Sequence, residues 1–160
     1  MALDVYTMTK FSHVLMGAAW VGGSLFFEFV VAGYLRRTLT KGDFHTQAGL
    51  LRKAGPFLGL TSVLTLITGL AYMVLKYGTD FSAIWALSNG RLILISLSLV
   101  LVAIGIGFGI LLPTSLKVIR ATSVDEARGP MGKLLKAGST NLLVVLVVLF
   151  LMIVAGSGGF

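Results

Sequence analysis

Residues 91–112 read RLILISLSLVLVAIGIGFGILL and contain no charged side chain after Arg91. As a helix that rises 1.5 Å per residue, this stretch is about 33 Å long, which is enough to cross the hydrocarbon core of a bilayer, about 30 Å thick. Three further apolar runs lie at about residues 11–35, 56–76 and 139–155. We therefore expect one transmembrane domain, residues 1–160, with an all-α fold: an antiparallel four-helix bundle with short loops.

The composition supports this fold class and excludes several functions. The 160 residues are 56% hydrophobic and only 12% charged, about half the charged share of a soluble domain. The absence of cysteine excludes disulfides, thiolate metal sites, iron–sulfur clusters and thiol nucleophiles. The Gly-rich stretch 105–109 lies in the middle of a span and follows no strand, so it is not a phosphate-binding loop. No internal repeat is apparent.

The lysines and arginines predict how the chain sits in the membrane. Five lie in the linker at residues 36–55 and five in the linker at 114–137, against three on the opposite side. By the positive-inside rule these linkers are cytoplasmic and both termini are outside. We expect an integral protein of a prokaryotic plasma membrane, with the net charge of +7 attracted to anionic lipid headgroups and not to nucleic acid.

The connectors between the spans give three further expectations. Tyr77, Phe81 and Trp85 recur every four residues, which predicts a short interfacial helix on the outer surface. The alternative is that this segment forms a lid over an outward-facing pocket. Pro56 is expected to open the second span, where a first helical turn tolerates it, and Pro113 to stop the third.

One face of the first span carries the residues that suggest chemistry. On a helix with 3.6 residues per turn, a single stripe contains His13, Trp20 and Glu28. Ionisable groups inside a membrane are expensive and are by default candidates for function. Because Arg91 begins the third span at the level of His13, we expect an outer site built from His13, Arg91 and Trp20. The alternatives are a histidine that only hydrogen-bonds a neighbouring helix and an arginine that reaches the headgroups.

Glu28 belongs to a different level of the membrane. It lies fifteen residues beyond His13, or about 22 Å along the axis, so the two side chains cannot touch. Arg36 and Arg37 lie about two turns further on, which places them beyond the expected reach of Glu28. We expect Glu28 to handle protons or ions, to pair with a basic residue of another helix, or to extend toward the inner headgroups.

A neutral imidazole in the membrane suggests a metal cofactor. Histidine is an axial ligand of haem iron, and an arginine near the surface suits a haem propionate. The second histidine, His45, lies in a linker on the other side, so haem b would be five-coordinate or take a methionine such as Met16 or Met73. Copper is the alternative, because histidine and methionine suit Cu(I); Met8 shares the outer side with His13.

Small residues in the spans favour close packing of the helices. The pairs are Ala18/Gly22 and Ala19/Gly23 in the first span, Thr65/Gly69 in the second and Gly105/Gly109 in the third. Such pairs let helix backbones approach closely, within one chain or between subunits. Thr61, Thr65 and Thr68 share one face of the second span, where each can hydrogen-bond its own backbone or a neighbour.

The stretch His13-Val-Leu-Met-Gly-Ala-Ala-Trp20-Val-Gly-Gly23 resembles the first helix of small membrane proteins of the CopD-domain and HemJ-type (protoporphyrinogen oxidase-like) group. Leu66-Ile-Thr-Gly-Leu70, the start of the third span and the last span are also similar to theirs. The resemblance implies that His13 is a haem ligand or a catalytic residue. It also aligns Arg91 with a functional lysine, whose acid–base role an arginine cannot take over because it stays charged.

Together these features lead to one hypothesis and two alternatives. The leading expectation is a membrane protein that binds haem b near the outer leaflet, in electron transfer or in redox chemistry of a lipophilic substrate. The first alternative is a permease or binding protein for copper or another cation, which uses His13, methionines and Glu28. The second is a non-catalytic subunit of a larger membrane complex. A homodimer is compatible with each.

Overall fold

The computed structural model describes residues 4–38 and 44–157, in which all regular secondary structure is helical. Residues 39–43 of the expected first linker lie outside the described residues, as does the side chain of His45. Four rods form the bundle, which confirms the all-α four-helix fold. Their elements are α1 (Val5–Phe26), the π-helical η1 (Phe27–Val31) and α2 (Ala32–Thr38) in the first rod; α3 (Phe44–Tyr77) in the second; α5 (Ser88–Ile106), the π-helical η3 (Gly107–Leu111) and α6 (Leu112–Arg120) in the third; and α7 (Val124–Gly156) in the fourth.

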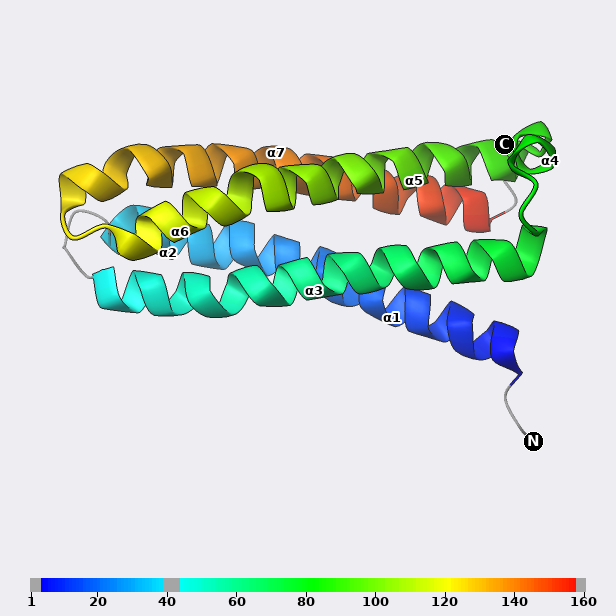
Figure 1. Ribbon diagram of the computed structural model, residues 1–160, viewed down its shortest axis with the longest axis horizontal. Helices are drawn as coiled ribbons and strands as arrows, with labels where there is room; N and C mark the ends of the chain where they lie inside the picture. The colour runs from blue at the N-terminus through cyan, green and yellow to red at the C-terminus, as the bar shows by residue number, and fades with distance from the viewer. Residues whose placement is uncertain (1–3, 39–43, 158–160) are drawn as a thin grey trace.

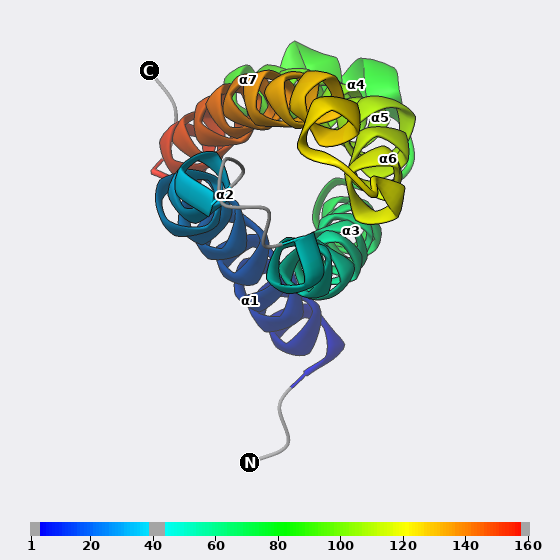
Figure 2. The ribbon, with the colours of Figure 1, turned by 90° about the vertical axis from the view of Figure 1, so that its left-hand side faces the viewer.

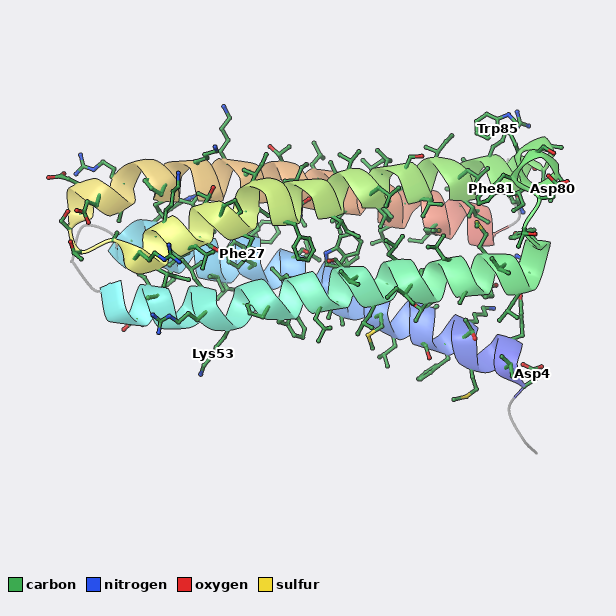
Figure 3. The ribbon with its side chains drawn as sticks, viewed as in Figure 1. Asp4, Phe27, Lys53, Asp80, Phe81 and Trp85 are labelled. Carbon is green, nitrogen blue, oxygen red and sulfur yellow. The ribbon has the colours of Figure 1, made fainter. Side chains whose placement is uncertain are left out.

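The rods run antiparallel and form a ring in chain order (Figures 1 and 2). α1 packs mainly on α3, and α5 mainly on α7. The start of α1, the end of α7 and the short helix α4 (Phe81–Ala86) lie at one end of the bundle, which we call the termini end. The opposite end carries the basic residues of the linkers, among them Arg36, Lys53 and Arg120, and we call it the basic end. Lys53 projects from α3 away from the bundle (Figure 3).

All four rods are long and apolar enough to cross a membrane. The candidate spans are Val5–Arg37, Thr46–Tyr77, Ser88–Arg120 and Val124–Gly156, each of 32 or 33 residues. At 1.5 Å per residue each rod is about 50 Å long, so its ends extend beyond a hydrocarbon core of about 30 Å. Large apolar side chains cover the outside of the bundle, for example Phe29 at 74% and Leu143 at 64% exposure, as expected for contact with lipid.

The expected roles of the prolines are wrong. Pro56 lies inside α3, which begins twelve residues earlier at Phe44, and the third rod continues through Pro113 to Arg120. A proline inside a helix removes the hydrogen bond to the carbonyl four residues before it, and its ring crowds that carbonyl. For Pro113 that carbonyl belongs to Gly109, inside η3, where the helix is already widened to a π-turn. The linkers are therefore largely helical, and the helices are longer than the apolar runs.

Two clusters of buried side chains hold the rods together. Near the basic end the core contains Val31, Leu35, Leu51, Val118 and Met131, from α3, α6, α7 and the first rod. A second cluster at mid-height contains Trp20, Val100, Ala103, Val145 and Val148. Toward the termini end α1 diverges from the other rods (Figure 1). That half of the bundle is therefore the less tightly packed one.

The expected interfacial helix is present as α4, although it is shorter than the aromatic stripe. Tyr77 ends α3, so α4 carries only Phe81 and Trp85, both more than half exposed (Figure 3). Asp80 caps α4 by accepting hydrogen bonds from the N–H groups of Ser82 (2.9 Å) and Ala83 (3.2 Å). The Ser82 hydroxyl also donates to Asp80, and these bonds lower the pKa of its carboxyl.

Gly90 allows α5 to begin directly against α4, and this contact gives a prediction. A Cβ at position 90 would overlap the carbonyl oxygen of Ile84, a backbone atom that cannot move aside. We expect Gly90→Ala to destabilise the fold by about 1–3 kcal/mol, as overpacking does. In thermal unfolding of the detergent-solubilised protein followed by circular dichroism, the midpoint should fall by several degrees.

Gly105→Ala is the matched control, because it lies on the same helix with no atom within 4 Å of the added Cβ. Since alanine is the better helix former, this variant should be at least as stable as the wild type. An unchanged melting temperature for Gly90→Ala would show that α4 is not held against α5.

Candidate functional site

Between the described parts of the four rods, one cavity lies in each half of the bundle. The larger of the two, about 680 Å³, lies in the half of the bundle nearer the termini end. All four rods line it, and we call it the His13 cavity. The smaller, about 340 Å³, lies toward the basic end. Trp20 lines both and is only 4% exposed, so its indole separates them. Sites for small molecules and cofactors usually measure about 300–1,000 Å³. The His13 cavity falls well within that range, and its surface is mostly apolar.

The hydrogen bond between His13 and α3 determines the protonation of the imidazole. Nδ1 of His13 lies 3.1 Å from the carbonyl oxygen of Thr65. Because a carbonyl only accepts hydrogen bonds, Nδ1 must carry the proton. The hydroxyl of Thr68, 3.5 Å from Nδ1, is a second and weaker neighbour, and it donates its own proton to the Leu64 carbonyl at 2.6 Å. The proton on Nδ1 leaves the lone pair of Nε2 available when the ring is neutral.

Nε2 is the ring nitrogen of His13 that remains without a hydrogen bond among the described residues. Within residues 4–38 and 44–157 it has no hydrogen-bond partner, and it is not among the buried unpartnered atoms, so its surface is open. Histidines that bind metals commonly donate their other N–H to a backbone carbonyl, which fixes the tautomer and the ring orientation. His13 has this arrangement, and no second histidine lines the described part of the cavity. The geometry provides one oriented nitrogen ligand.

Gly69 makes the position of the ring possible. A Cβ at residue 69 would lie 2.8 Å from Cε1 and 3.1 Å from Nδ1 of His13. The imidazole therefore rests directly on the backbone of α3, and any other residue type at this position would displace it. The sequence predicts the Thr65/Gly69 pair as a helix-packing pair. The structure shows that it also accommodates the histidine, since Thr65 supplies the carbonyl and Gly69 the space.

Aromatic and cationic side chains complete this side of the cavity. The Tyr72 ring lies nearly parallel to that of His13, with centroids 6.3 Å apart, and its hydroxyl is 3.0 Å from that of Tyr6. Lys10 and Lys76 line the cavity toward the termini end, and the Lys76 ammonium lies 4.8 Å from the centroid of the Tyr77 ring. These lysines are not among the site residues predicted from the sequence, although Lys10 directly precedes the first apolar run and Lys76 ends the second.

Of the three residues expected at the outer site, two come together. His13 and Trp20 both line the cavity, whereas Arg91 is exposed and lines neither cavity. The reason is the rotation of the helix: Ile93, which does face the cavity, is two residues from Arg91, or about 200° around the axis. The cationic groups that line the cavity are instead Lys10 and Lys76. The aromatic residues of α4 do not line it, so α4 forms no lid.

The structure also shows which methionines line the His13 cavity. Met73, which is buried, and Met152 line the His13 cavity. Met16, considered as an iron ligand, does not line it, and Met8 is 46% exposed. No group of three or more histidine, aspartate or glutamate side chains that could hold a metal ion occurs in the described part of the chain. Any metal held here needs ligands of another kind or a cofactor that carries it.

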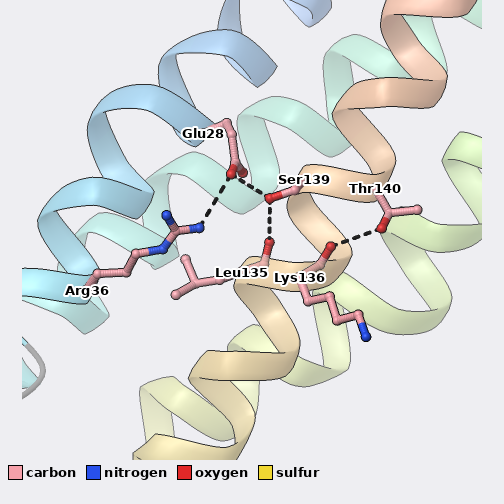
Figure 4. A network of polar contacts seen from close by, with 6 residues as sticks. All are labelled: Glu28, Arg36, Leu135, Lys136, Ser139 and Thr140. Carbon is pink, nitrogen blue, oxygen red and sulfur yellow. Dashed lines mark hydrogen bonds and ion pairs between the residues drawn. The ribbon is translucent and has the colours of Figure 1, made fainter.

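Glu28 lies in η1 at the contact with α7 (Figure 4), and although it lines neither cavity, its neighbours Phe27 and Gly138 line the smaller one. Its Oε1 accepts a hydrogen bond of 2.6 Å from the Ser139 hydroxyl and lies 3.7 Å from Nη2 of Arg36. The expectation that Arg36 is out of reach is therefore wrong, because both long side chains extend along the rod toward each other. Oε2 is buried beside Gly138, without a hydrogen-bond partner among the described residues. Glu28 thus joins the first and fourth rods.

The Ser139 contact predicts a specific effect on stability. Ser139→Ala removes the short bond to a carboxylate that is only 13% exposed, so we expect a loss of about 1–2 kcal/mol, given that bonds to charged groups contribute about 1.5–3. Arg36→Gln should cost less, about 0–1 kcal/mol, since Arg36 is 57% exposed. Chemical unfolding in detergent measures both.

Thr140→Ala is the control, because the Thr140 hydroxyl bonds only the Lys136 carbonyl of its own helix (Figure 4). Its effect should stay within about 0.5 kcal/mol. Equal losses for Ser139→Ala and Thr140→Ala would show that the link between the rods contributes nothing.

The resemblance to CopD-domain and HemJ-type proteins stays a prediction from short motifs. In comparisons with known proteins, no family model, curated protein or solved structure matches this chain.

Proposed function

We propose that this protein binds b-type haem in the His13 cavity and serves electron transfer or redox chemistry of a lipophilic molecule. One observation carries the proposal: an imidazole held by its Nδ1–H, with Nε2 open, beside an apolar cavity of about 680 Å³. A neutral imidazole in this tautomer is the usual protein ligand of haem iron. When bound, the group would supply one-electron chemistry.

The other lining residues fit such a group. The mostly apolar walls suit a large hydrophobic ring, and Trp20 closes the cavity on the side of the basic end. Lys10 and Lys76 place two cations toward the termini end, where they would pair with propionate groups. Arg91 does not contribute to this role, since it lines no cavity.

The charge distribution supports an orientation for the site. With ten lysines and arginines in the two linkers, the basic end would face the cytoplasm and its anionic headgroups. The His13 cavity would then lie in the outer half of the membrane. A lipophilic partner would reach it from the bilayer on the side where α1 diverges from the bundle (Figure 1).

The test is the optical spectrum of the purified protein after addition of haem. We expect a Soret band in the wild type and its loss in His13→Ala, because the only histidine in the cavity is removed. Gly69→Ala should weaken binding roughly 5- to 150-fold, since 1–3 kcal/mol of overpacking displaces the ring. Titration of each variant with haem in detergent measures the affinity.

His45→Ala is the matched control, because the chain has two histidines and this one lies at the start of α3, far along the chain from the cavity. It should bind haem like the wild type. A folded wild-type protein that binds no haem, or a His13→Ala variant that binds it equally well, would refute the proposal.

Cu(I) is a second candidate, favoured by the sulfur atoms in the same cavity. Met73 and Met152 line it together with His13, and thioether and imidazole ligands suit Cu(I). Competition with a chromogenic Cu(I) chelator distinguishes the two functions. If copper is the ligand, Met73→Leu and Met152→Leu each weaken Cu(I) binding, and the isolated protein contains copper and shows no affinity for haem.

A further inference from the structure

The described helices form two units with the same internal layout. In the first unit α1 ends at Phe26, η1 spans Phe27–Val31 and α3 begins at Phe44. In the second α5 ends at Ile106, η3 spans Gly107–Leu111 and α7 begins at Val124. These boundaries in the second unit lie 80 residues after their counterparts, and the remaining helix ends lie 79 to 83 residues after theirs. In both units the first rod packs on the second.

The same offset of 80 residues relates several of the buried positions, although Ala32 and Met73 have the exposed counterparts Leu112 and Ile153. Gln47 and Ala127 are both buried, as are Leu51 and Met131, Trp20 and Val100, and Thr65 and Val145. The residues that line the His13 cavity follow it as well. All three that α5 contributes are counterparts of lining residues in α1: Ile93 of His13, Leu97 of Gly17, and Val100 of Trp20. The paired residue types differ, which is why no repeat is apparent in the sequence.

The two units stand side by side and run in the same direction. α1 and α5 occupy opposite corners of the ring, as do α3 and α7 (Figure 2). Units of this kind are related by a rotation about an axis along the bundle, as in the parallel repeats of membrane proteins. The His13 cavity lies between the units, so Ile93 faces it from the corner opposite to His13.

The two walls of this cavity are chemically different. Every polar or charged side chain that lines it comes from the first unit: Lys10, His13, Thr65, Tyr72, Lys76 and Tyr77, together with the indole of Trp20. The second unit contributes only apolar residues, such as Ile93, Leu97, Val145 and Leu149. Leu149 is the counterpart of Gly69, so the space that Gly69 leaves for an imidazole is filled in the second unit.

We propose that the His13 cavity is a one-sided site: its ligand is held by the first unit alone, and the wall formed by Ile93 and Leu149 leaves room for a second, small and uncharged molecule. This inference rests on the proposed function, since with haem bound it means a free coordination position on the iron. The aliphatic side chains of Ile93 and Leu149 offer neither hydrogen bonds nor charge, so this part of the wall favours a diatomic or similar apolar molecule over an ion.

Carbon monoxide is the probe for this position. The full-length protein is loaded with haem, reduced, and examined by optical spectroscopy before and after addition of carbon monoxide. We expect a five-coordinate spectrum that converts to the carbonyl form. A six-coordinate low-spin spectrum before addition, lost in Met152→Leu or Met73→Leu, would overturn the inference while the proposed function stands. A folded protein with no Soret band would overturn both.

A double variant tests the correspondence between the two units. Ile93→His combined with Leu149→Gly installs in the second unit the pair that His13 and Gly69 form in the first. We expect the haem to become six-coordinate and carbon monoxide affinity to fall by about tenfold or more, since the probe must then displace a protein ligand. Ile93→Leu with Leu149→Gly is the matched control and should stay five-coordinate. A folded double variant with the spectrum of this control would overturn the inference.

Discussion

The hydrogen bond from Nδ1 of His13 to the Thr65 carbonyl is the contact on which the site depends. It joins α1 to α3 in the half of the bundle where α1 diverges from the other rods, and it determines which imidazole nitrogen is free. The bond exists because Gly69 has no side chain and lets the ring approach the backbone of α3. A polar group at this depth is costly unless it is paired, and here half of its hydrogen-bonding capacity is satisfied by main chain. The other ring nitrogen, Nε2, is open to the cavity.

Much of the fold could be predicted from composition and periodicity. Runs of apolar residues located the four rods, and the helical stripe through His13 and Trp20 placed both in the bundle interior, where they line the cavity. The helix ends could not be predicted, because Pro56 and Pro113 were treated as boundaries. A proline removes a single hydrogen bond, and a long helix packed against its neighbours tolerates that loss. The π-helical segments η1 and η3 are likewise not predicted from the sequence.

Fewer of the residues that form the site could be predicted from the sequence. Arg91 was grouped with His13 by depth alone, although its angular position relative to Ile93 turns it away from the cavity. The depth of a residue along a helix can be counted from the sequence. To predict the direction of its side chain, one must also know which face of the helix packs inward. The role of Gly69 depends on its distance to a residue 56 positions away in the chain, which only the tertiary structure supplies. The Glu28–Ser139 contact between the first and fourth rods is of the same kind.

The indole of Trp20 has a consequence for what can pass through the protein. Together with Val100, Ala103 and Val145 it forms an apolar layer across the bundle, with one cavity on each side. Water or ions that entered either cavity would meet this layer, where a charge has nothing to solvate it. A buried apolar layer thus lies between the two cavities. Any flow of ions from end to end would require the tryptophan to swing aside.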